Sequence, residues 1–288
     1  MIKILMVGNW HHKNEKFLIN LISKTENLTR VTIIDNADII ISANIKYNAE
    51  NYPNKKFIFG PHFSVFPNNI VRSINNIHNN CSYIQPSQPS VNTWQKEFNF
   101  TNIPMKAIPF GVDTEKFTIS NENKTNVLLY YKNRDPQELI FLENYLKNKN
   151  INYRLFSYQK RYDENDYLNY LKTCKYGIWL GCHESQGFAL EEALSCNIPL
   201  LIWNVRLRYQ EWTNREIYKN VKSEVTTIPY WDDRCGEYFY TSNELDKTFN
   251  KFINNLDKYR PREYILENVG MEVCYKKWNE LIEFMLNK

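Results

Sequence analysis

The strongest structural signal in this chain is the stretch Gly181-Cys-His-Glu-Ser-Gln-Gly-Phe-Ala-Leu-Glu-Glu-Ala-Leu-Ser-Cys-Asn-Ile-Pro-Leu200. It follows an apolar run at residues 176–180, whose length and lack of polar alternation predict a buried strand. Gly187 is placed to open a helix, and the segment 197–199 with its proline is placed to end it. A second strand is expected at 200–203, which makes the stretch a strand–loop–helix–strand unit of a parallel sheet.

The loop before the predicted helix is suited to bind an anion, because the first N–H groups of a helix have no intrahelical partners. Those groups belong to Gly187, Phe188 and Ala189. Glu184 lies in the loop, and Glu192 follows eight residues later on the helix. Two carboxylates beside an anion site are suited to accept hydrogen bonds from sugar hydroxyls. A nucleotide sugar carries both a diphosphate and hydroxyls, so it matches this arrangement.

The same stretch resembles the Glu-x7-Glu motif of retaining glycosyltransferases with the two-domain GT-B fold. The residues that match are Glu184, the pair Gly187-Phe188 and the pair Glu192-Ala193. A second segment, Ile108-Pro-Phe-Gly-Val-Asp-Thr-Glu-Lys-Phe117, resembles the interdomain signature of that family. The resemblance covers the chain well from roughly residue 105 onward and weakly before it.

The resemblance implies an α/β protein with two Rossmann-like domains that face each other across a cleft. We expect an acceptor domain at 1–117, a nucleotide-sugar donor domain at 118–270, and a C-terminal helix at 271–288 that crosses back to the first domain. The implied activity is hexosyl transfer, with retention, from a nucleoside-diphosphate sugar to a glycan or to a lipid-linked or protein-linked sugar acceptor. The family's roles assign donor-sugar contact to Glu184 and ribose contact to Glu192.

A loop with two cations follows the first predicted strand of the second domain, Tyr131-Lys-Asn-Arg-Asp-Pro136. Open α/β sheets bind ligands at this carboxyl edge. Members of the family hold the diphosphate with an Arg followed by a Lys, whereas here Lys132 precedes Arg134. We expect Arg134 to bind phosphate through its forked donors, with Lys132 as the weaker partner. The resemblance also places His62 near the donor sugar, so the expected catalytic residues are Glu184, Arg134 and His62.

The sequence predicts no metal site and no cofactor besides the donor substrate. Asp-x-Asp, the pair with which metal-dependent glycosyltransferases of the other major fold hold a divalent ion, does not occur in it. The six cysteines form no Cys-x-x-Cys pair, which argues against zinc and favours reduced thiols in a cytoplasmic protein. We therefore expect a metal-free transfer.

Composition agrees with two domains and limits the partners. The 288 residues are 43% hydrophobic and 15% aromatic, which excludes a disordered chain. A net charge of +4 does not call for nucleic acid. No apolar run approaches the roughly 20 residues of a spanning helix, and no signal peptide is recognisable. The amphipathic segment 13–24 permits docking to a membrane surface, although a core-facing helix is the favoured interpretation.

Short apolar runs alternate with helical patterns along the rest of the chain, as in two parallel sheets. In the first half, strands are expected at 2–7, 31–34, 38–42, 56–59, 82–84 and 105–108. In the second half, strands are expected at 126–131, 153–156, 176–180, 200–203 and 224–229. Helices are expected there at 136–148, 166–174, 243–256 and 263–287, the last interrupted at Gly270.

Two alternatives stay open at this stage. A sugar-nucleotide epimerase shares the two-domain architecture, although it would need acid and base groups near the anomeric carbon. A non-catalytic protein that binds a sugar nucleotide is the other alternative, because the Gly-rich loop that the family often has after the first strand is missing at 8–12. The product formed from a sugar nucleotide distinguishes all three.

Overall fold

Two parallel β-sheets form the centres of the two units of this protein. The structure is a computed structural model, and it describes residues 1–61, 80–98, 105–220 and 224–288. One unit comprises Met1–Gly111 together with Met271–Lys288, and the other comprises Val112–Gly270. His62, one of the expected catalytic residues, lies outside the described residues.

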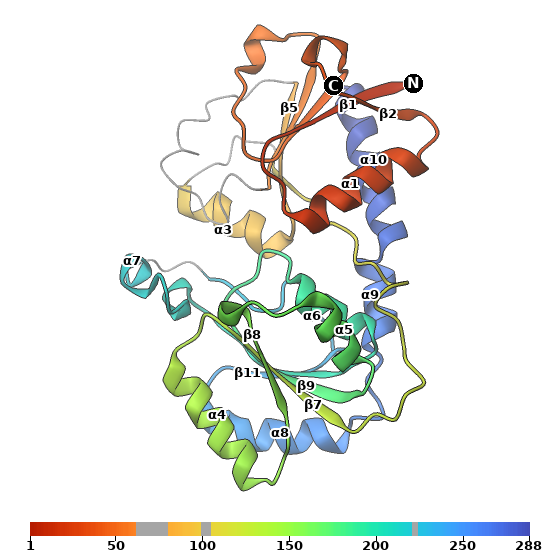
Figure 1. The fold of residues 1–288 in the computed structure, drawn as a ribbon. Coiled ribbons are helices and arrows are strands. Elements are labelled where there is room, and N and C mark those ends of the chain that lie inside the picture. Colours follow the sequence, from red (N-terminus) through yellow and green to blue (C-terminus); the bar gives the residue numbers. More distant parts are fainter. Residues whose placement is uncertain (62–79, 99–104, 221–223) are drawn as a thin grey trace. The chain divides into compact units, whose positions relative to one another are not determined.

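The first unit contains a six-stranded sheet in the order β2-β1-β3-β4-β5-β6, with every neighbouring pair parallel (Figure 1). The strands are β1 (Ile2–Val7), β2 (Leu28–Val31), β3 (Ile39–Ser42), β4 (Lys56–Phe59), β5 (Cys81–Gln85) and β6 (Met105–Ala107). The three central strands β3, β4 and β5 are almost entirely buried, as expected for a parallel sheet covered on both faces.

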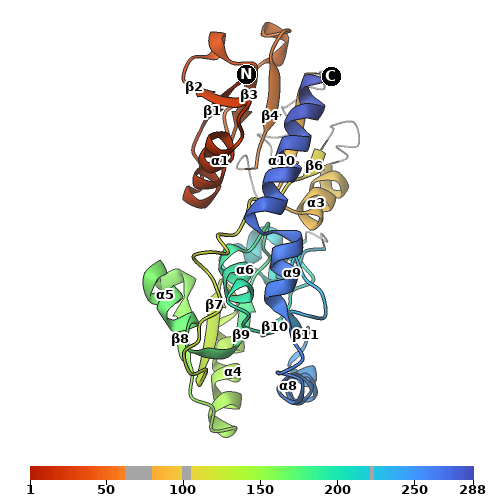
Figure 2. The ribbon, with the colours of Figure 1, turned by 90° about the vertical axis from the view of Figure 1, so that its right-hand side faces the viewer.

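Helices from both ends of the chain cover the first sheet. They are α1 (His12–Lys24), α3 (Gln88–Phe98) and the C-terminal α10 (Met271–Leu286), with short 3₁₀ turns η1 (Ile34–Asn36) and η2 (Ala49–Asn51). Figure 2 shows α10 in blue beside this unit's strands. Phe17 of α1 stacks on Tyr275 of α10, and the Trp278 indole donates to the Pro109 carbonyl at 3.0 Å. These contacts explain why the last helix belongs to the unit formed by the first residues.

The second unit contains a five-stranded parallel sheet in the order β11-β10-β9-β7-β8. Its strands are β7 (Asn126–Lys132), β8 (Arg154–Ser157), β9 (Cys174–Gly181), β10 (Leu200–Trp203) and β11 (Gly236–Phe239). Its helices are α4 (Pro136–Asn148), α5 (Glu164–Leu171), α6 (Phe188–Ser195), α7 (Arg215–Tyr218), α8 (Leu245–Asn254) and α9 (Pro261–Asn268), with 3₁₀ turns η3 (Tyr158–Lys160), η4 (Arg208–Gln210) and η5 (Ser242–Glu244).

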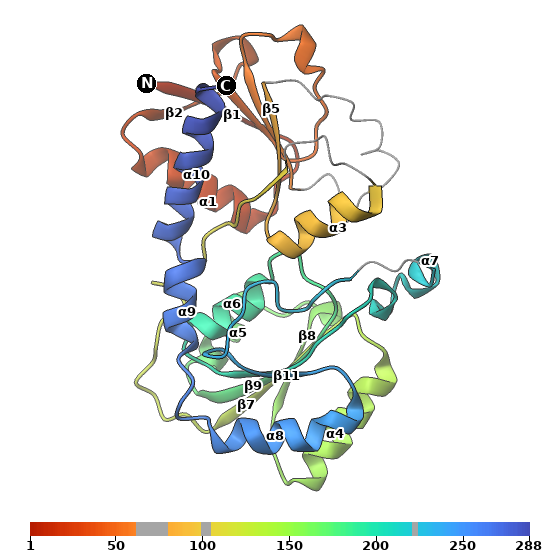
Figure 3. The same cartoon turned by 180° about the vertical axis from the view of Figure 1, so that it is seen from behind.

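Alternate strand residues of the second sheet face different helices. Leu129, Tyr131 and Ile178 belong to the core that contains side chains of α4 and α8, whereas Tyr130 stacks on Trp179 on the opposite face. Helices α4 and α8 lie on one side of the sheet and α5 and α6 on the other (Figures 1 and 3). The last strand residue on the α5–α6 side is Lys132, two positions after Tyr130.

Three expectations for secondary structure need comment. The strand expected at 31–34 is wrong, because Leu28 is buried in β2 whereas Ile33 is exposed. The strand expected at 224–229 is also wrong, because the sheet is completed by β11 instead, and residue 224 makes only an isolated bridge to residue 207. The interruption expected at Gly270 is confirmed, since it separates α9 from α10. Among the helices described, none has the length and apolar character needed to cross a membrane.

Candidate functional site

The carboxyl edge of the second sheet brings together two loops that are far apart in sequence. The strand pairing aligns Lys132 at the end of β7 with Gly181 at the end of β9. The Cys182 N–H then donates to the Lys132 carbonyl at 2.9 Å, which extends the pairing one residue into the loop. The loop at 182–187 therefore starts beside Lys132, at the sheet edge where open α/β proteins bind ligands.

Lys132 and Glu184 form a close ion pair at this edge. The lysine Nζ lies 2.8 Å from each carboxylate oxygen, and the side chains keep 21% and 11% of their exposure. The Tyr158 ring, which is exposed, lies 4.8 Å from the same Nζ. Burial is the largest single influence and lowers the pKa of Lys132, but the charge and hydrogen bond of Glu184, together with Cys182 and Tyr158, outweigh it, so the net pKa lies above its ordinary value. Lys132 is therefore a cation that keeps some access to solvent.

The N-terminus of α6 lies next to Glu184. Gly187 is the N-cap residue in a left-handed conformation with φ of 94°, and as a glycine it supplies no side-chain cap of its own. A Cβ built on Gly187 would lie 3.5 Å from both Cβ and Cγ of Glu184, so this carboxylate side chain packs against the start of the helix. The first intrahelical bond runs from Glu191 N–H to the Gly187 carbonyl. The helix start predicted from the sequence is confirmed.

The two adjacent glutamates of α6 point to different surroundings. Glu191 is fully buried and accepts a hydrogen bond from Gln186 Nε2 at 3.1 Å. The pKa of Tyr162 rises to about 12, mainly because its hydroxyl is buried. The negative charge of Glu192 raises this pKa further. The positive charge of Lys132 acts on the same hydroxyl in the opposite direction. Glu192 and Lys132 are therefore both near Tyr162, whereas Glu191 contacts Gln186.

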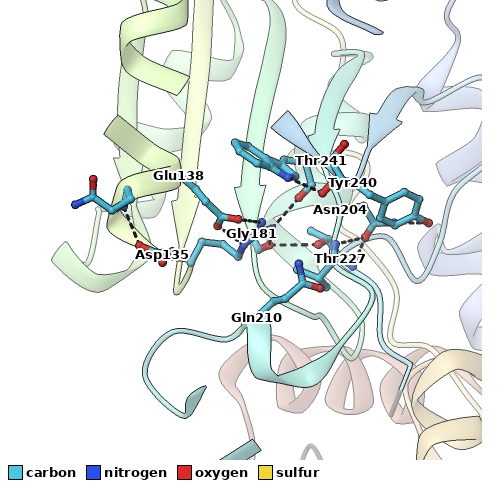
Figure 4. A network of polar contacts seen from close by, with 12 residues as sticks. Asp135, Glu138, Gly181, Asn204, Gln210, Thr227, Tyr240 and Thr241 are labelled. Carbon is cyan, nitrogen blue, oxygen red and sulfur yellow. Dashed lines mark hydrogen bonds and ion pairs between the residues drawn. The ribbon is translucent and has the colours of Figure 1, made fainter. Parts of the chain in front are cut away.

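Arg134 occupies a different position from the one expected. Its side chain is completely buried, and its Nε and Nη2 donate to the two carboxylate oxygens of Glu138, each at 2.8 Å. Its Nη1 donates to the carbonyls of Gly181 at 3.1 Å and Trp203 at 3.0 Å. Protein acceptors thus occupy four of its donors, and the guanidinium presents no surface to a ligand. Figure 4 shows Glu138 and Gly181 in this network.

The loop that carries Glu184 also has a second group of contacts. The Glu184 N–H donates to the Thr226 carbonyl at 2.9 Å. Asn204 Oδ1 accepts from the Thr227 N–H at 2.8 Å and from the Thr226 hydroxyl at 3.2 Å, and the Thr227 hydroxyl donates to the Gly181 carbonyl (Figure 4). Asn204 and both threonines were missed in the sequence, because side chain-to-backbone bonds in loops leave no periodic pattern.

His183 directly precedes Glu184 and lies next to a segment that follows β10. Its Nδ1 lies 3.2 Å from Glu211 Oε2. Burial, then the charges of Lys132 and Arg208, lowers the pKa of His183 to about 3, so the imidazole is neutral near neutral pH. Asn133 Nδ2 donates to Glu211 at 3.0 Å, which ties this segment to the loop that carries Lys132. His183 acts here as a neutral buried group.

The structure thus brings together most of the expected donor-site residues. Lys132, Glu184 and Glu192 lie with the start of α6, to which the expected phosphate-binding residues Gly187, Phe188 and Ala189 belong. Tyr158 and Tyr162 also lie near Lys132. In the sequence, the only indication of this was that both residues closely follow β8. In the described part of the chain, no group of three or more His, Cys, Asp or Glu side chains is arranged to hold a metal ion.

Comparison with known proteins identifies the fold. No protein-family model and no curated sequence matches the chain. Among solved structures, the lipopolysaccharide outer core galactosyltransferase WaaB is 12% identical, with a TM-score of 0.61 over 98% of this chain and 99% of that one. Sucrose-phosphate synthase from Thermosynechococcus elongatus is 12% identical, with a TM-score of 0.57 over 87% and 74%. The catalytic domain of starch synthase IV from Arabidopsis thaliana, bound to ADP and acarbose, is 9% identical, with a TM-score of 0.51 over 96% and 76%.

This chain has two α/β units, each with a parallel sheet, and it aligns with these neighbours over most of its length. The two Rossmann-like units of this chain are therefore those of the GT-B fold, as the sequence predicted. At identities of 9–12%, the comparisons establish the architecture. The chemistry has to be argued from the residues at the sheet edge.

Proposed function

We propose that this protein is a glycosyltransferase that takes its sugar from a nucleoside-diphosphate sugar. The observation that carries the proposal is the Lys132–Glu184 ion pair beside the start of α6, whose N-cap residue is a glycine. A cation and a helix N-terminus suit a diphosphate, and a carboxylate at their side suits the hydroxyls of the attached sugar. The fold neighbours support this reading, because their names include a galactosyltransferase and a synthase bound to ADP.

Donor binding exchanges the partners of the ion pair. The diphosphate takes the Lys132 ammonium and the N–H groups of Gly187, Phe188 and Ala189, and Glu184 turns to hydroxyls of the sugar. Glu192, which like Lys132 is near Tyr162, accepts hydrogen bonds from the ribose hydroxyls. A helix N-terminus contributes about 0.3–2 kcal/mol toward an anion, whereas micromolar affinity needs about 8 kcal/mol. The cation and both carboxylates therefore contribute substantially to donor affinity.

In the proposed reaction the bond between the anomeric carbon and the diphosphate oxygen breaks, and a bond from that carbon to an acceptor hydroxyl oxygen forms. The diphosphate leaves with the bonding electron pair, and the proton of the acceptor hydroxyl passes to an oxygen of the departing diphosphate. Lys132 and the α6 N–H groups stabilise the charge that develops on the leaving group. We propose a hexosyl group, retention of configuration, no requirement for a metal, and a sugar acceptor that is a glycan or is linked to a lipid or protein.

A ligand screen followed by product analysis tests this function. We expect one of the UDP-, GDP-, ADP- or dTDP-sugars to raise the melting temperature, and Lys132→Met to remove most of that shift. Lys219→Met is the matched control, because Lys219 is an exposed lysine of the same unit that pairs with Glu216. When the protein is incubated with the sugar nucleotide that raises its melting temperature, we expect either transfer of the sugar or slow release of free sugar. An epimer as the sole product, or tight binding with neither reaction, would contradict transfer in favour of the two alternatives.

A further inference from the structure

We infer that Arg134 is a positioning residue, which fixes the backbone of the loop carrying Glu184 without itself touching the donor. This inference rests on the proposed function, because it concerns how Glu184 reaches the sugar. It reverses the expected role of Arg134, which from its sequence position was a phosphate ligand. The contacts of the guanidinium and the second anchor at Asn204 support it.

The guanidinium joins the ends of three elements. One nitrogen, Nη1, donates to the last carbonyl of β9, at Gly181, and to the last carbonyl of β10, at Trp203. The other edge of the fork, Nε and Nη2, is held by both oxygens of Glu138 on α4. A bidentate pair fixes the plane of the fork as well as its position. The carbonyl of Gly181, three residues before Glu184, is therefore held in a defined direction.

Asn204 provides a second anchor, which meets the first at the same carbonyl. Gly181 O accepts from Arg134 and, at 3.3 Å, from the Thr227 hydroxyl. Asn204 fixes the Thr227 N–H and the Thr226 hydroxyl, and the Thr226 carbonyl receives the N–H of Glu184. Figure 4 shows Gly181, Thr227 and Asn204 along this chain of bonds. The loop is thus held at Gly181 and again at Glu184 itself.

This fixation has a functional consequence, because Glu184 loses its lysine partner when the diphosphate binds. A carboxylate on a loose loop would then follow the loop, and a misplacement of about 1 Å costs on the order of 100-fold in rate. With its backbone fixed at both points, Glu184 stays in place for the sugar. A lysine at position 134 would keep the charge but not the fork that reaches Glu138 and two carbonyls together.

The test compares Arg134→Lys with Arg262→Lys. Arg262 is the matched control, because its guanidinium also bonds backbone carbonyls of this unit, those of Thr114, Phe117 and Ser195, and none of its hydrogen bonds among the described residues reaches the Glu184 loop. Calorimetry gives the affinities for a nucleoside diphosphate and for its sugar, and an assay gives kcat. We expect R134K to bind the bare diphosphate within about twofold of wild type and to lose at least tenfold in kcat. R262K should change neither.

Two results would overturn the inference. If R134K weakened the bare diphosphate as strongly as Lys132→Met, Arg134 would be a phosphate ligand; if kcat were unchanged, it would have no positioning role. Hydrogen exchange at the Glu184 amide is a readout that needs no ligand, and it should be faster in R134K and unchanged in R262K. Should R134K fail to fold, Asn204→Ala replaces it with the same expectations. If the wild-type protein binds no sugar nucleotide, the proposed function is refuted. If hydrogen exchange at the Glu184 amide is as slow in R134K as in wild type, the positioning role of Arg134 is refuted.

Discussion

Lys132 and Arg134 are cations two residues apart in one loop, and each is paired with a glutamate, yet their surroundings differ completely. The Lys132 side chain keeps 21% of its exposure and hydrogen-bonds only Glu184 among the described residues, whereas the Arg134 side chain has no exposure and also bonds two main-chain carbonyls. A ligand can replace Glu184 at Lys132. No ligand can replace the carbonyls at Arg134 without opening the ends of two strands. The comparison shows that access, and not residue type, separates the ligand-binding cation from the structural one.

The backbone between the two cations explains their different surroundings. Lys132 ends β7 on the face shared with Tyr130, which is the α5–α6 side. Asn133 has a left-handed φ of 51°, so the chain changes direction there. Arg134 then reaches under the strand ends toward Glu138 in the first turn of α4. One residue in an uncommon conformation therefore places the two side chains in different layers.

Removal of the buried cation should have the greatest effect on stability. Arg134→Met leaves Glu138 and two carbonyls without their donor, so we expect a loss of about 3 kcal/mol, the lower end for breaking a buried ion pair, since Glu138 is 27% exposed. Urea unfolding measures this. Arg154→Met is the control, because Arg154 and Asp166 are both more than 40% exposed and should contribute at most about 1 kcal/mol. Equal losses for the two variants would refute the contrast.

Glu184→Gln separates sugar contact from phosphate contact. The amide keeps the shape but removes the charge that receives sugar hydroxyls, so we expect transfer to fall by about 1.5–3 kcal/mol, or roughly 10–150-fold. Affinity for the bare nucleoside diphosphate should not fall, because Lys132 loses its competing partner. Steady-state kinetics and calorimetry provide the two values. Full transfer activity in this variant would remove the sugar contact from the account.

Lys132→Met, unlike Glu184→Gln, should weaken binding of the bare nucleoside diphosphate. We expect affinity for the bare nucleoside diphosphate to fall by about 1.5 kcal/mol, the lower end for hydrogen bonds to charged groups, because Lys132 gives up Glu184 in order to bind. Calorimetry against wild type measures the loss. Lys219→Met should bind the diphosphate as wild type does. An unchanged affinity in the Lys132 variant would place the diphosphate elsewhere.

The titration of His183 should make the free energy of unfolding depend on pH. Its folded pKa of about 3 lies below the unfolded value of about 6.5, so its stabilising contribution is present above pH 6.5 and is lost as the pH falls toward 3. We expect a loss of about 1.4 kcal/mol between pH 8 and pH 5.5 from this residue. The measurement is the difference between wild type and His183→Gln in urea unfolding at the two pH values. Parallel pH profiles would show that His183 titrates normally in the folded protein.

The sequence predicted the architecture and the α6 end of the site, because both depend on local patterns. Unbroken apolar runs indicate parallel strands, and Gly187 marks the start of α6. Glu184 packs against that helix start, whereas the donor-binding roles of Glu184 and Glu192 stay predictions. These features need no knowledge of distant contacts.

The errors at Arg134 and at 224–229 depend on contacts between distant segments. Arg134 resembled a phosphate ligand until its carbonyl partners at Gly181 and Trp203 were known. The run at 224–229 has the composition of a strand, but Asn204 binds its backbone and side chains, and β11 takes the sheet edge. The pairing of Lys132 with Glu184, 52 residues apart, follows from strand register and not from any motif.

A crystal structure of the complex with the stabilising sugar nucleotide decides whether the Lys132–Glu184 pair forms the donor site. We predict the Lys132 ammonium within about 3 Å of a diphosphate oxygen, the Glu184 carboxylate turned to sugar hydroxyls, and the Arg134 network unchanged. A complex with the Lys132–Glu184 pair intact and the diphosphate bound away from the start of α6 would contradict the account.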